Sequence, residues 1–454
     1  MQMNRNRYAA GLLALVLSGG MMLAGCTQSQ SSDPTAAQSG LQKQTQNTGT
    51  DGEDGNQTDV ESMDDAIDLA GDEISPGTTK LSGNAVKITA GGTYTLSGSG
   101  KMVIVDAKGQ DVTLVLDGVT LKNDTGPGIY VKKAESLSVE LKGDNAITCG
   151  KSFEYEALNA ALYSKADLKI SGDGSLDIQT EYGHGIKAKD SAEFDCRLQI
   201  EALQDGIHVN DTAVFAGGSY EIQAQSEGIE SKDVLEIREG TFSVNAADDA
   251  LNAASSLKIS GGKLDLTSRT NDAVDSNGTL EISGGQIQAV ALRSPETAFD
   301  VDNTPFVISG GTIAGLGTNG VYPTQADQPL LLAAVSSAGP VRVEKDGKTI
   351  LEAGFDQASS ESDQGRGPGS GSLVLFLSCP EMKAGDTVTV YVNDESLGEV
   401  TLEQGTTTLG TVATMGGPGG GGQQGPGGMM EGRPSDPDQM PEGPAGGRSR
   451  QQFQ

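Results

Sequence analysis

The chain has 454 residues, of which 64 are glycine and none is tryptophan, and its formal net charge is −31. Such a glycine-rich, aromatic-poor composition argues against a helical globule. The negative charge argues against nucleic acid or anionic lipid as a direct partner, because each phosphate contact would start from repulsion. Cations, or ligands bridged by cations, are the partners that this charge favours.

The first 25 residues are a predicted secretion signal. Two early arginines precede an apolar stretch over 9–23, which is too short and too glycine-rich for a comfortable membrane span. The run Leu23-Ala24-Gly25-Cys26 then resembles the lipobox of bacterial lipoproteins. The resemblance implies that Cys26 is acylated and anchors the folded part outside the membrane. An ordinary signal peptide with a chance cysteine is the alternative.

Polar segments flank the body of the chain. Residues 26–77 are rich in Ser, Thr, Gln and Asp and predict a flexible tether, while the Gly/Pro-rich residues 413–454 predict a disordered tail. Between them the sequence predicts a repeat domain over 78–330. For 331–412 it predicts either terminal rungs or a small β-module that covers the open end of the repeat.

A repeat of 21–25 residues dominates the middle of the chain. Each unit carries one apolar residue at a fixed place, here called the anchor, and the anchors are Ile186, Ile207, Ile229, Leu251, Val274 and Phe299, with looser members at Ile129 and Leu162. Two more short strands per unit, such as 257–259 and 264–266, flank a Ser-Gly-Gly corner and alternate apolar with polar residues. Three short strands per unit predict an all-β, three-sided parallel β-helix with rungs about 4.8 Å apart.

Stacking the rungs aligns polar residues in columns beside the anchors. Carboxylates at rung spacing would repel by roughly 3 kcal/mol per pair at an effective dielectric near 20. Calcium would relieve this charge, since it binds several carboxylate and amide oxygens in loose geometry. The predicted calcium ligands are Asp205, Glu227, Glu230, Asp248, Asp249, Asn252, Asp272 and Asp275.

The calcium prediction depends on the local backbone. Two acids three residues apart face opposite ways on a straight strand, so they share an ion only where Gly206, Gly228, Ala250 or Ala273 marks a bend. A solvated acidic face with splayed side chains is the alternative.

Catalytic constellations are sparse. The two histidines, His184 and His208, lie one rung apart in the predicted register, without a Ser or Cys partner, and Lys187 is the only basic member of its column. No catalytic residue is therefore predicted. The residues predicted to contact a ligand are Tyr130, Tyr163, Lys187 and His208.

From about residue 91 to 411 the chain resembles bacterial surface lipoproteins with a carbohydrate-binding parallel β-helix. The stretches that carry the resemblance, in order, are 112–119, 161–168, 205–208, 227–230 and 248–252. The resemblance implies a right-handed, pectate-lyase-like solenoid, bound calcium, and binding of cellulose or polygalacturonate. Ala250 and Ala273 replace the glycine that the family carries before the anchor, which is expected to weaken those two sites.

The sequence thus predicts a non-catalytic, calcium-containing, polysaccharide-binding lipoprotein on the extracellular face of the membrane. Two other functions stay open. One is a calcium-dependent pectate-type lyase, for which Lys187 is the only basic candidate in its column. The other is a structural or adhesive spacer without a glycan ligand.

Overall fold

The computed structural model describes residues 65–71, 75–291, 293–302, 305–355 and 373–413, which fall within one unit of the chain, Glu61–Gln454. The regular elements of these ranges are all β-strands, and no helix there is long and apolar enough to span a membrane. The predicted signal, Cys26 and nearly all of the predicted tail lie outside the described residues.

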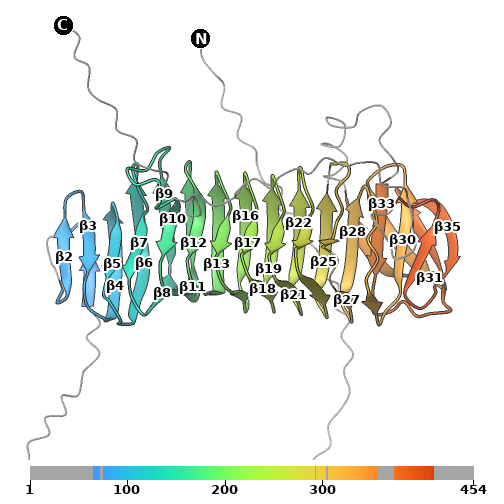
Figure 1. Cartoon of the computed structure of the whole chain (residues 1–454), viewed down its shortest axis with the longest axis horizontal. Coiled ribbons are helices and arrows are strands. Elements are labelled where there is room, and N and C mark those ends of the chain that lie inside the picture. Colours follow the sequence, from blue (N-terminus) through green and yellow to red (C-terminus); the bar gives the residue numbers. More distant parts are fainter. Residues whose placement is uncertain (1–64, 72–74, 292, 303–304, 356–372, 414–454) are drawn as a thin grey trace, which may run out of the picture. The chain divides into compact units, whose positions relative to one another are not determined.

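The strands stack rung on rung in three ladders, as Figure 1 shows. The first ladder is a sheet of 11 short strands, of which only the first pair is antiparallel. Its strands are β2 (Thr78–Leu81), β3 (Ala85–Ile88), β5 (Val103–Asp106), β7 (Ile129–Lys133), β10 (Ala160–Ser164), β12 (His184–Ala188), β14 (Ile207–Val209), β17 (Ile229–Ser231), β20 (Leu251–Ala253), β23 (Val274–Ser276) and β26 (Asp300–Val301).

The second and third ladders share long strands that pair first on one face and then on the next. These are β4 (Gly92–Gly100), β6 (Val112–Asn123), β11 (Asp167–Thr180) and β13 (Ala192–Ala202). The second ladder also holds β8 (Ser136–Lys142), β15 (Ala213–Phe215), β18 (Val234–Ile237), β21 (Ser256–Ile259), β24 (Thr279–Ile282), β27 (Phe306–Ile308) and β29 (Gln325–Ala326). The third holds β9 (Asp144–Cys149), β16 (Ser219–Ala224), β19 (Thr241–Ala246), β22 (Lys263–Ser268), β25 (Gln286–Ala291) and β28 (Thr312–Gly317).

The predicted three-sided parallel architecture is confirmed, and so is the predicted register. Ile207 pairs with Ile186 on one side and with Ile229 on the other, and the series continues through Leu251 and Val274. Each anchor is fully buried. Parallel stacking in register places every anchor on the one before it, so each contributes about 1.5–3 kcal/mol of apolar burial to a continuous core.

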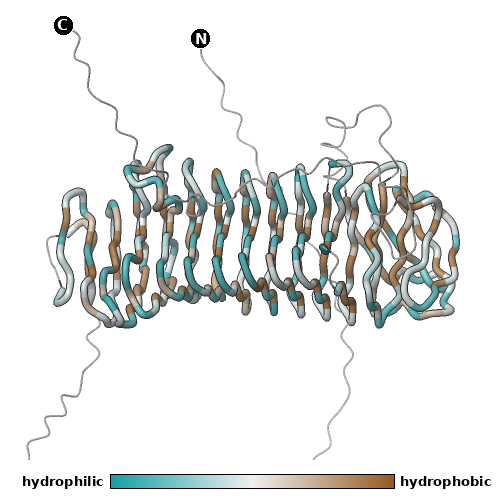
Figure 2. The backbone as a smooth tube through the Cα atoms, viewed as in Figure 1, coloured by the Kyte–Doolittle hydropathy of each residue, from teal (hydrophilic) through white to brown (hydrophobic). Residues whose placement is uncertain are grey.

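Alternation along most strands of the second and third ladders separates the core from the surface. In β16, Tyr220, Ile222 and Ala224 are buried while the residues between them are exposed. Figure 2 shows the same alternation of apolar and polar residues from rung to rung. A period of two is what a strand with one buried face requires.

The paired glycines mark the corner between the second and third ladders. Gly262 has φ of +88°, a conformation that L side chains rarely adopt. A Cβ on Gly261 would lie 2.2 Å from the carbonyl oxygen of Arg238 on the preceding rung. The two glycines are therefore needed for different reasons, one for its backbone angle and one for close approach of two rungs.

The N-terminal end differs from the sequence prediction. Strand β1 (Asp65–Asp68) lies inside the predicted tether and pairs in parallel with Tyr94–Ser97 of β4. Ile67 and Leu69 are buried, so two alternating apolar residues join this segment to the core. The tether prediction is wrong for residues 65–71, because it rested on average composition and two apolar residues hardly change an average.

The C-terminal end departs from parallel stacking. Strand β33 (Leu373–Ser378) pairs antiparallel with β28 and with β30 (Leu330–Val335), and β36 (Thr406–Leu409) pairs with β30. A separate antiparallel sheet follows in the order β32 (Lys348–Gly354), β31 (Pro340–Lys345), β34 (Thr387–Val392), β35 (Glu395–Thr401). A second apolar cluster fills the space beneath it. Because antiparallel strands cover the last parallel rung, its backbone groups are not left as a free edge.

Candidate functional site

The sequence-predicted site residues lie on the outer side of the first ladder. The residue after each anchor forms one column, here called the outer stripe, which runs Tyr130, Tyr163, Lys187, His208, Glu230, Asn252, Asp275 and Asp300. The stripe passes from aromatic through basic to acidic side chains along the stack. The four predicted ligand-contact residues and three of the predicted calcium ligands therefore share one face.

A second column lies beside the outer stripe, two residues before each anchor, and is here called the corner column. It contains His184, Asp205, Glu227, Asp249, Asp272 and Thr297. At least two of its side chains, those of Asp205 and Asp249, turn toward the outer stripe. Asp205 Oδ2 lies 2.8 Å from His208 Nδ1, and Asn252 Nδ2 donates to Asp249 Oδ2 at 2.8 Å.

The backbone bend on which the calcium prediction depended is therefore present. Strand β14 begins only at Ile207, so Asp205 belongs to the corner before it and not to the straight strand. At Gly206 a Cβ would lie 2.3 Å from Ile222 Cγ2, so packing requires glycine there. The register places Leu266 where the two preceding rungs have Ile222 and Val244. Leucine is not branched at Cβ, and on this rung the buried Ala250 stands where the preceding rungs have glycine. The contact between Asn252 and Asp249 forms across Ala250, so alanine does not abolish the bend.

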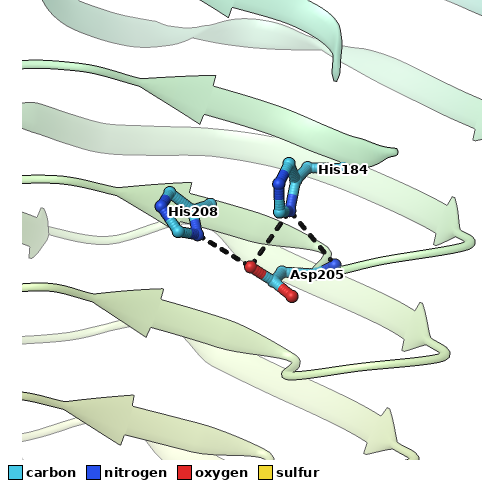
Figure 3. A group of neighbouring side chains, drawn as sticks. All are labelled: His184, Asp205 and His208. Carbon is cyan, nitrogen blue, oxygen red and sulfur yellow. Dashed lines mark hydrogen bonds and ion pairs between the residues drawn. The ribbon is translucent and has the colours of Figure 1, made fainter. Parts of the chain in front are cut away.

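The corner column and the outer stripe converge most closely at His184, Asp205 and His208, as Figure 3 shows. Asp205 Oδ2 lies 3.0 Å from His184 Nδ1 and 2.8 Å from His208 Nδ1. Glu230 Oε2 lies 2.6 Å from the same nitrogen of His208. All four side chains are buried, although they stand on the outer face, because each is covered by its neighbours on adjacent rungs.

The charges in this cluster are strongly coupled. Burial raises the pKa of Asp205, but hydrogen bonds from His184 and His208 outweigh burial and hold this pKa well below its usual range. Burial lowers the pKa of His184, whereas for His208 the hydrogen bonds to Asp205 and Glu230 outweigh burial and raise the pKa. Burial and then the charge of Asp205 raise the pKa of Glu227 to about 8. An ionised Asp205 thus faces His208, whose charged form is favoured, and Glu227, whose neutral form is favoured.

An acidic segment, formed by Asp249, Asn252, Asp272 and Asp275, continues the two columns beyond this cluster. The Asn252 amide lies between two carboxylates and donates to Asp249 Oδ2 at 2.8 Å and to Asp275 Oδ2 at 3.0 Å. Asp272 lies in the corner, where its Oδ1 accepts the backbone N–H of Thr297 at 2.6 Å. Asp248 is half-buried beside Asp249, and no contact of its carboxylate with the other predicted ligands is seen in the described residues.

Carboxylates of the acidic segment resist ionisation. Burial raises the pKa of Asp249 to about 8, and burial together with the charge of Asp300 raises that of Asp275 to about 7. Burial also raises the pKa of Asp272 to about 6. Asp300 and Glu296 add charge at the end of the segment, although neither is among the ligands predicted from the sequence. The signal for Asp300 was its place after the anchor Phe299.

Tyr130 and Tyr163 contact each other edge to face, with ring centroids 5.9 Å apart. Tyr163 is buried and Tyr130 is half-buried, so neither ring offers a fully open face to a sugar. Tyr155 is 71% exposed, in the insertion between β9 and β10. Sequence reasoning missed Tyr155, because the insertion lies outside the repeat and its position could not be derived from the period.

Of the eight predicted calcium ligands, the structure brings Asp205, Glu227 and Glu230 into one cluster and links Asp249, Asn252 and Asp275 through the asparagine amide. His184 was not predicted as a ligand, yet it joins the first cluster. The signal that would have found it is its register position directly before Asp205 in the corner column. Lys187, the candidate base of a lyase, is buried and its Nζ lies 3.5 Å from His184 Nε2.

Comparison with known proteins agrees with the resemblance at the level of the family. A carbohydrate-binding domain-containing protein of Acetivibrio thermocellus is 36% identical over 116 residues, which are 23% of this chain and 41% of that protein, so less than half of the relative is covered. The solved structure of the polysaccharide lyase-like protein from C. thermocellum, a gadolinium derivative, is 28% identical, with a TM-score of 0.44 over 48% of this chain and 95% of that one. The model of the carbohydrate-binding domain-containing protein family matches residues 82–362, well over half of the chain. The chain therefore belongs to the carbohydrate-binding domain-containing protein family.

Proposed function

We propose that the outer stripe binds an acidic polysaccharide through calcium ions held by the acidic segment, without cleaving the chain. The observation that carries this proposal is the group of carboxylates formed by Asp249 and Asp272 of the corner column and Asp275 of the outer stripe. Their pKa values, raised to between about 6 and about 8, mean that the metal-free fold holds carboxylates with too little positive charge nearby. A divalent cation would supply that charge.

Oxygen ligands for calcium are already close together. The Asn252 amide contacts the carboxylates of Asp249 and Asp275 through Nδ2. Rotation of this amide by half a turn would place its carbonyl oxygen between the same two carboxylates, which gives three oxygen donors from three adjacent positions. Calcium takes 6–8 oxygen ligands, so water and a carboxylate of the glycan would complete the shell.

The charge of the protein favours a bridged acidic glycan such as polygalacturonate. A protein with a net charge of −31 repels an acidic glycan unless cations lie between them. Cellulose, the neutral alternative, would depend on stacking against aromatic rings, and the tyrosines of the outer stripe are largely covered. The residues of the acidic segment support calcium-dependent binding of an acidic glycan.

The test is binding of the full chain to polygalacturonate and to cellulose, in calcium and in excess chelator. Wild-type protein should bind polygalacturonate only with calcium. Asp249→Asn with Asp275→Asn should weaken this binding at least tenfold, since both changes remove ligand charge. Glu239→Gln with Glu281→Gln removes the same charge from exposed positions outside the first ladder and is the matched control.

Three results would contradict the proposal in different ways. Binding that survives excess chelator would exclude calcium bridging. Growth of the absorbance of unsaturated uronates during long incubation would show a lyase in place of a binding protein. Binding to neither glycan, with or without calcium, would favour the structural or adhesive spacer.

A further inference from the structure

The only two histidines of the chain meet in one cluster on adjacent rungs. His184 begins β12, His208 lies in β14, and the Nδ1 atoms of both rings face the same oxygen, Asp205 Oδ2, at 3.0 and 2.8 Å (Figure 3). Glu230 Oε2, from β17, lies 2.6 Å from His208 Nδ1. We propose that this cluster binds zinc or a similar first-row transition-metal ion through both imidazoles and Asp205.

The donor atoms distinguish this cluster from the acidic segment. Calcium binds oxygen ligands, whereas imidazole nitrogen combined with carboxylate oxygen is typical of zinc and its first-row neighbours. Two nitrogens and one oxygen, with water in the fourth position, make up the four ligands that a tetrahedral zinc ion takes. Asp205, which the sequence predicts as a calcium ligand, therefore belongs to a site of different chemistry.

The geometry requires only a small expansion to admit an ion. Ligand atoms about 2.0–2.1 Å from a tetrahedral zinc ion stand about 3.3 Å from one another. The ligand atoms of His184, Asp205 and His208 all lie within 4.8 Å of one another, and Asp205 Oδ2 is 3.0 and 2.8 Å from the two Nδ1 atoms. Small shifts of these three side chains would place their ligand atoms around one ion.

Proton accounting at His208 supports an ion at this place. Its Nδ1 carries at most one proton, yet Asp205 Oδ2 and Glu230 Oε2 both lie within 2.8 Å of it. An ion in place of that proton would bind Asp205 directly, and the charge of Glu230 beside His208 would favour the cation. Binding forms bonds from the ion to both Nδ1 atoms, each ring is neutral when bound, and the proton of His208 Nδ1 is released to solvent.

The residues around the cluster orient the ligands, and two groups oppose ion binding. The backbone N–H of Asp205 donates to His184 Nδ1 at 3.3 Å, and an ion on this nitrogen would replace that hydrogen bond. Lys232 Nζ binds the other carboxylate oxygen of Glu230, Oε1, and so orients Oε2 toward His208. When His184 binds an ion through Nδ1, its Nε2 must carry the ring proton. Nε2 lies 3.5 Å from Lys187 Nζ, so a second donor and a positive charge face this N–H. Lys187 therefore weakens ion binding.

The test uses the untagged full chain with zinc, and with cobalt as a spectroscopic probe. The wild type should bind one equivalent of either ion, with visible cobalt bands of a four-coordinate complex. Because the chain has two histidines, the imidazole region of a proton NMR spectrum contains two sets of ring signals, and both should shift. His184→Gln with His208→Gln should weaken binding by a factor of roughly 100 or more, which exceeds a typical loss of an outer partner.

A gain-of-affinity variant keeps the proposal testable if the histidine variant folds poorly. Lys187→Gln places a carbonyl oxygen, which accepts the His184 Nε2–H, where an opposing ammonium stood, and should tighten zinc binding severalfold. No zinc binding by the wild type would overturn the proposal. So would zinc binding without a shift of the imidazole signals, undiminished binding by the double histidine variant, or displacement of zinc by an equal concentration of calcium.

This proposal does not depend on the proposed function. Removing zinc with a zinc-selective chelator should leave calcium-dependent binding of polygalacturonate within about twofold of its starting value. Asp249→Asn with Asp275→Asn should in turn leave zinc affinity unchanged. Failure at one site with success at the other would identify which of the two proposals is wrong.

Discussion

Acidic side chains of the corner column accept hydrogen bonds from the backbone of the next rung, in addition to any role in binding an ion. Asp249 Oδ1 accepts the backbone N–H of Asp272 at 3.1 Å, and Asp272 Oδ1 accepts that of Thr297 at 2.6 Å. Each acid thus satisfies a donor at the corner of the next rung, where the strand has not yet begun. Asparagine retains an acceptor oxygen of the same reach, so Asp→Asn variants separate the charge of these residues from their structural role.

The raised carboxyl pKa values predict how stability depends on pH without calcium. A carboxyl group whose pKa is raised on folding stabilises the folded state while protonated, and this stabilisation is lost as the pH rises through the folded-state pKa. Asp249, with a pKa of about 8, Asp275 and Glu227 all act in this direction. In chelator the free energy of unfolding should therefore fall between pH 5 and pH 8, by ~1.4 kcal/mol for each tenfold change in proton affinity of one group.

Urea unfolding at pH 5 and pH 8, with calcium and with chelator, measures this dependence. His208 acts in the same direction as the acids, because its pKa is raised, whereas the lowered pKa of His184 acts in the opposite direction. Calcium should flatten or reverse the decline, since bound carboxylates are ionised throughout. Asp249→Asn with Asp275→Asn should flatten it even in chelator. The same change in unfolding free energy between pH 5 and pH 8 for wild type and variant, with calcium and with chelator, would contradict the assignment.

The repeating structural unit of this fold is the rung of three strands, and a single rung has no hydrophobic core of its own. Ile229 of β17 pairs with Ile207 before it and Leu251 after it, and none of the three is exposed. The apolar side of a rung is buried only when both neighbours are in place. A change at one anchor therefore affects three rungs.

Ile229→Asp should be severely destabilising, by more than about 4 kcal/mol, because it buries a charge without a partner between two apolar rungs. Ile229→Val keeps the branched shape, removes one methylene, and should cost only about 0.5–1.5 kcal/mol. Thermal and urea unfolding of both variants would measure the difference. Similar small losses for both would mean that this rung is not packed as the register indicates.

At the scale of the whole molecule, the type of side chain on the outer face of the first ladder changes from one end of the stack to the other. The outer stripe begins with two tyrosines, continues through Lys187 and the histidine cluster, and ends in carboxylates that reach Asp300. Repetition of one backbone rung lets each rung present a different side chain at the same position, so binding chemistries follow one another along the stack. This arrangement suits a polymer, which can contact several rungs at once.

Membrane anchoring through Cys26 remains a prediction from the lipobox-like sequence. Replacing Cys26 with Ala should move the protein from the membrane fraction to the soluble or secreted fraction. Without Cys26 the protein has no residue to carry the predicted lipid. Cell fractionation, with Cys149→Ala as a control at a buried cysteine, measures this. Membrane association that does not change in Cys26→Ala would contradict the prediction.

The sequence by itself determined the rung, the three-sided architecture and the register. Parallel stacking requires like residues to lie on one another, so a column such as Ile186, Ile207 and Ile229 is fixed by periodicity alone. Periodicity could not predict the structure where the repeat is interrupted. The two examples are β1, inside a polar segment, and the insertion that carries Tyr155.

Only the tertiary structure decided which polar residues meet. Whether Asp205 faces His208 depends on where β14 begins, and its contact with His184 joins residues on different rungs. Those distances depend on the bend at Gly206, and this bend depends in turn on the packing of Ile222. Periodicity reports which residues share a column, but the direction of a side chain at a corner follows from close packing in three dimensions. For this reason a histidine that the sequence left aside became part of the most closely packed polar cluster of the outer face.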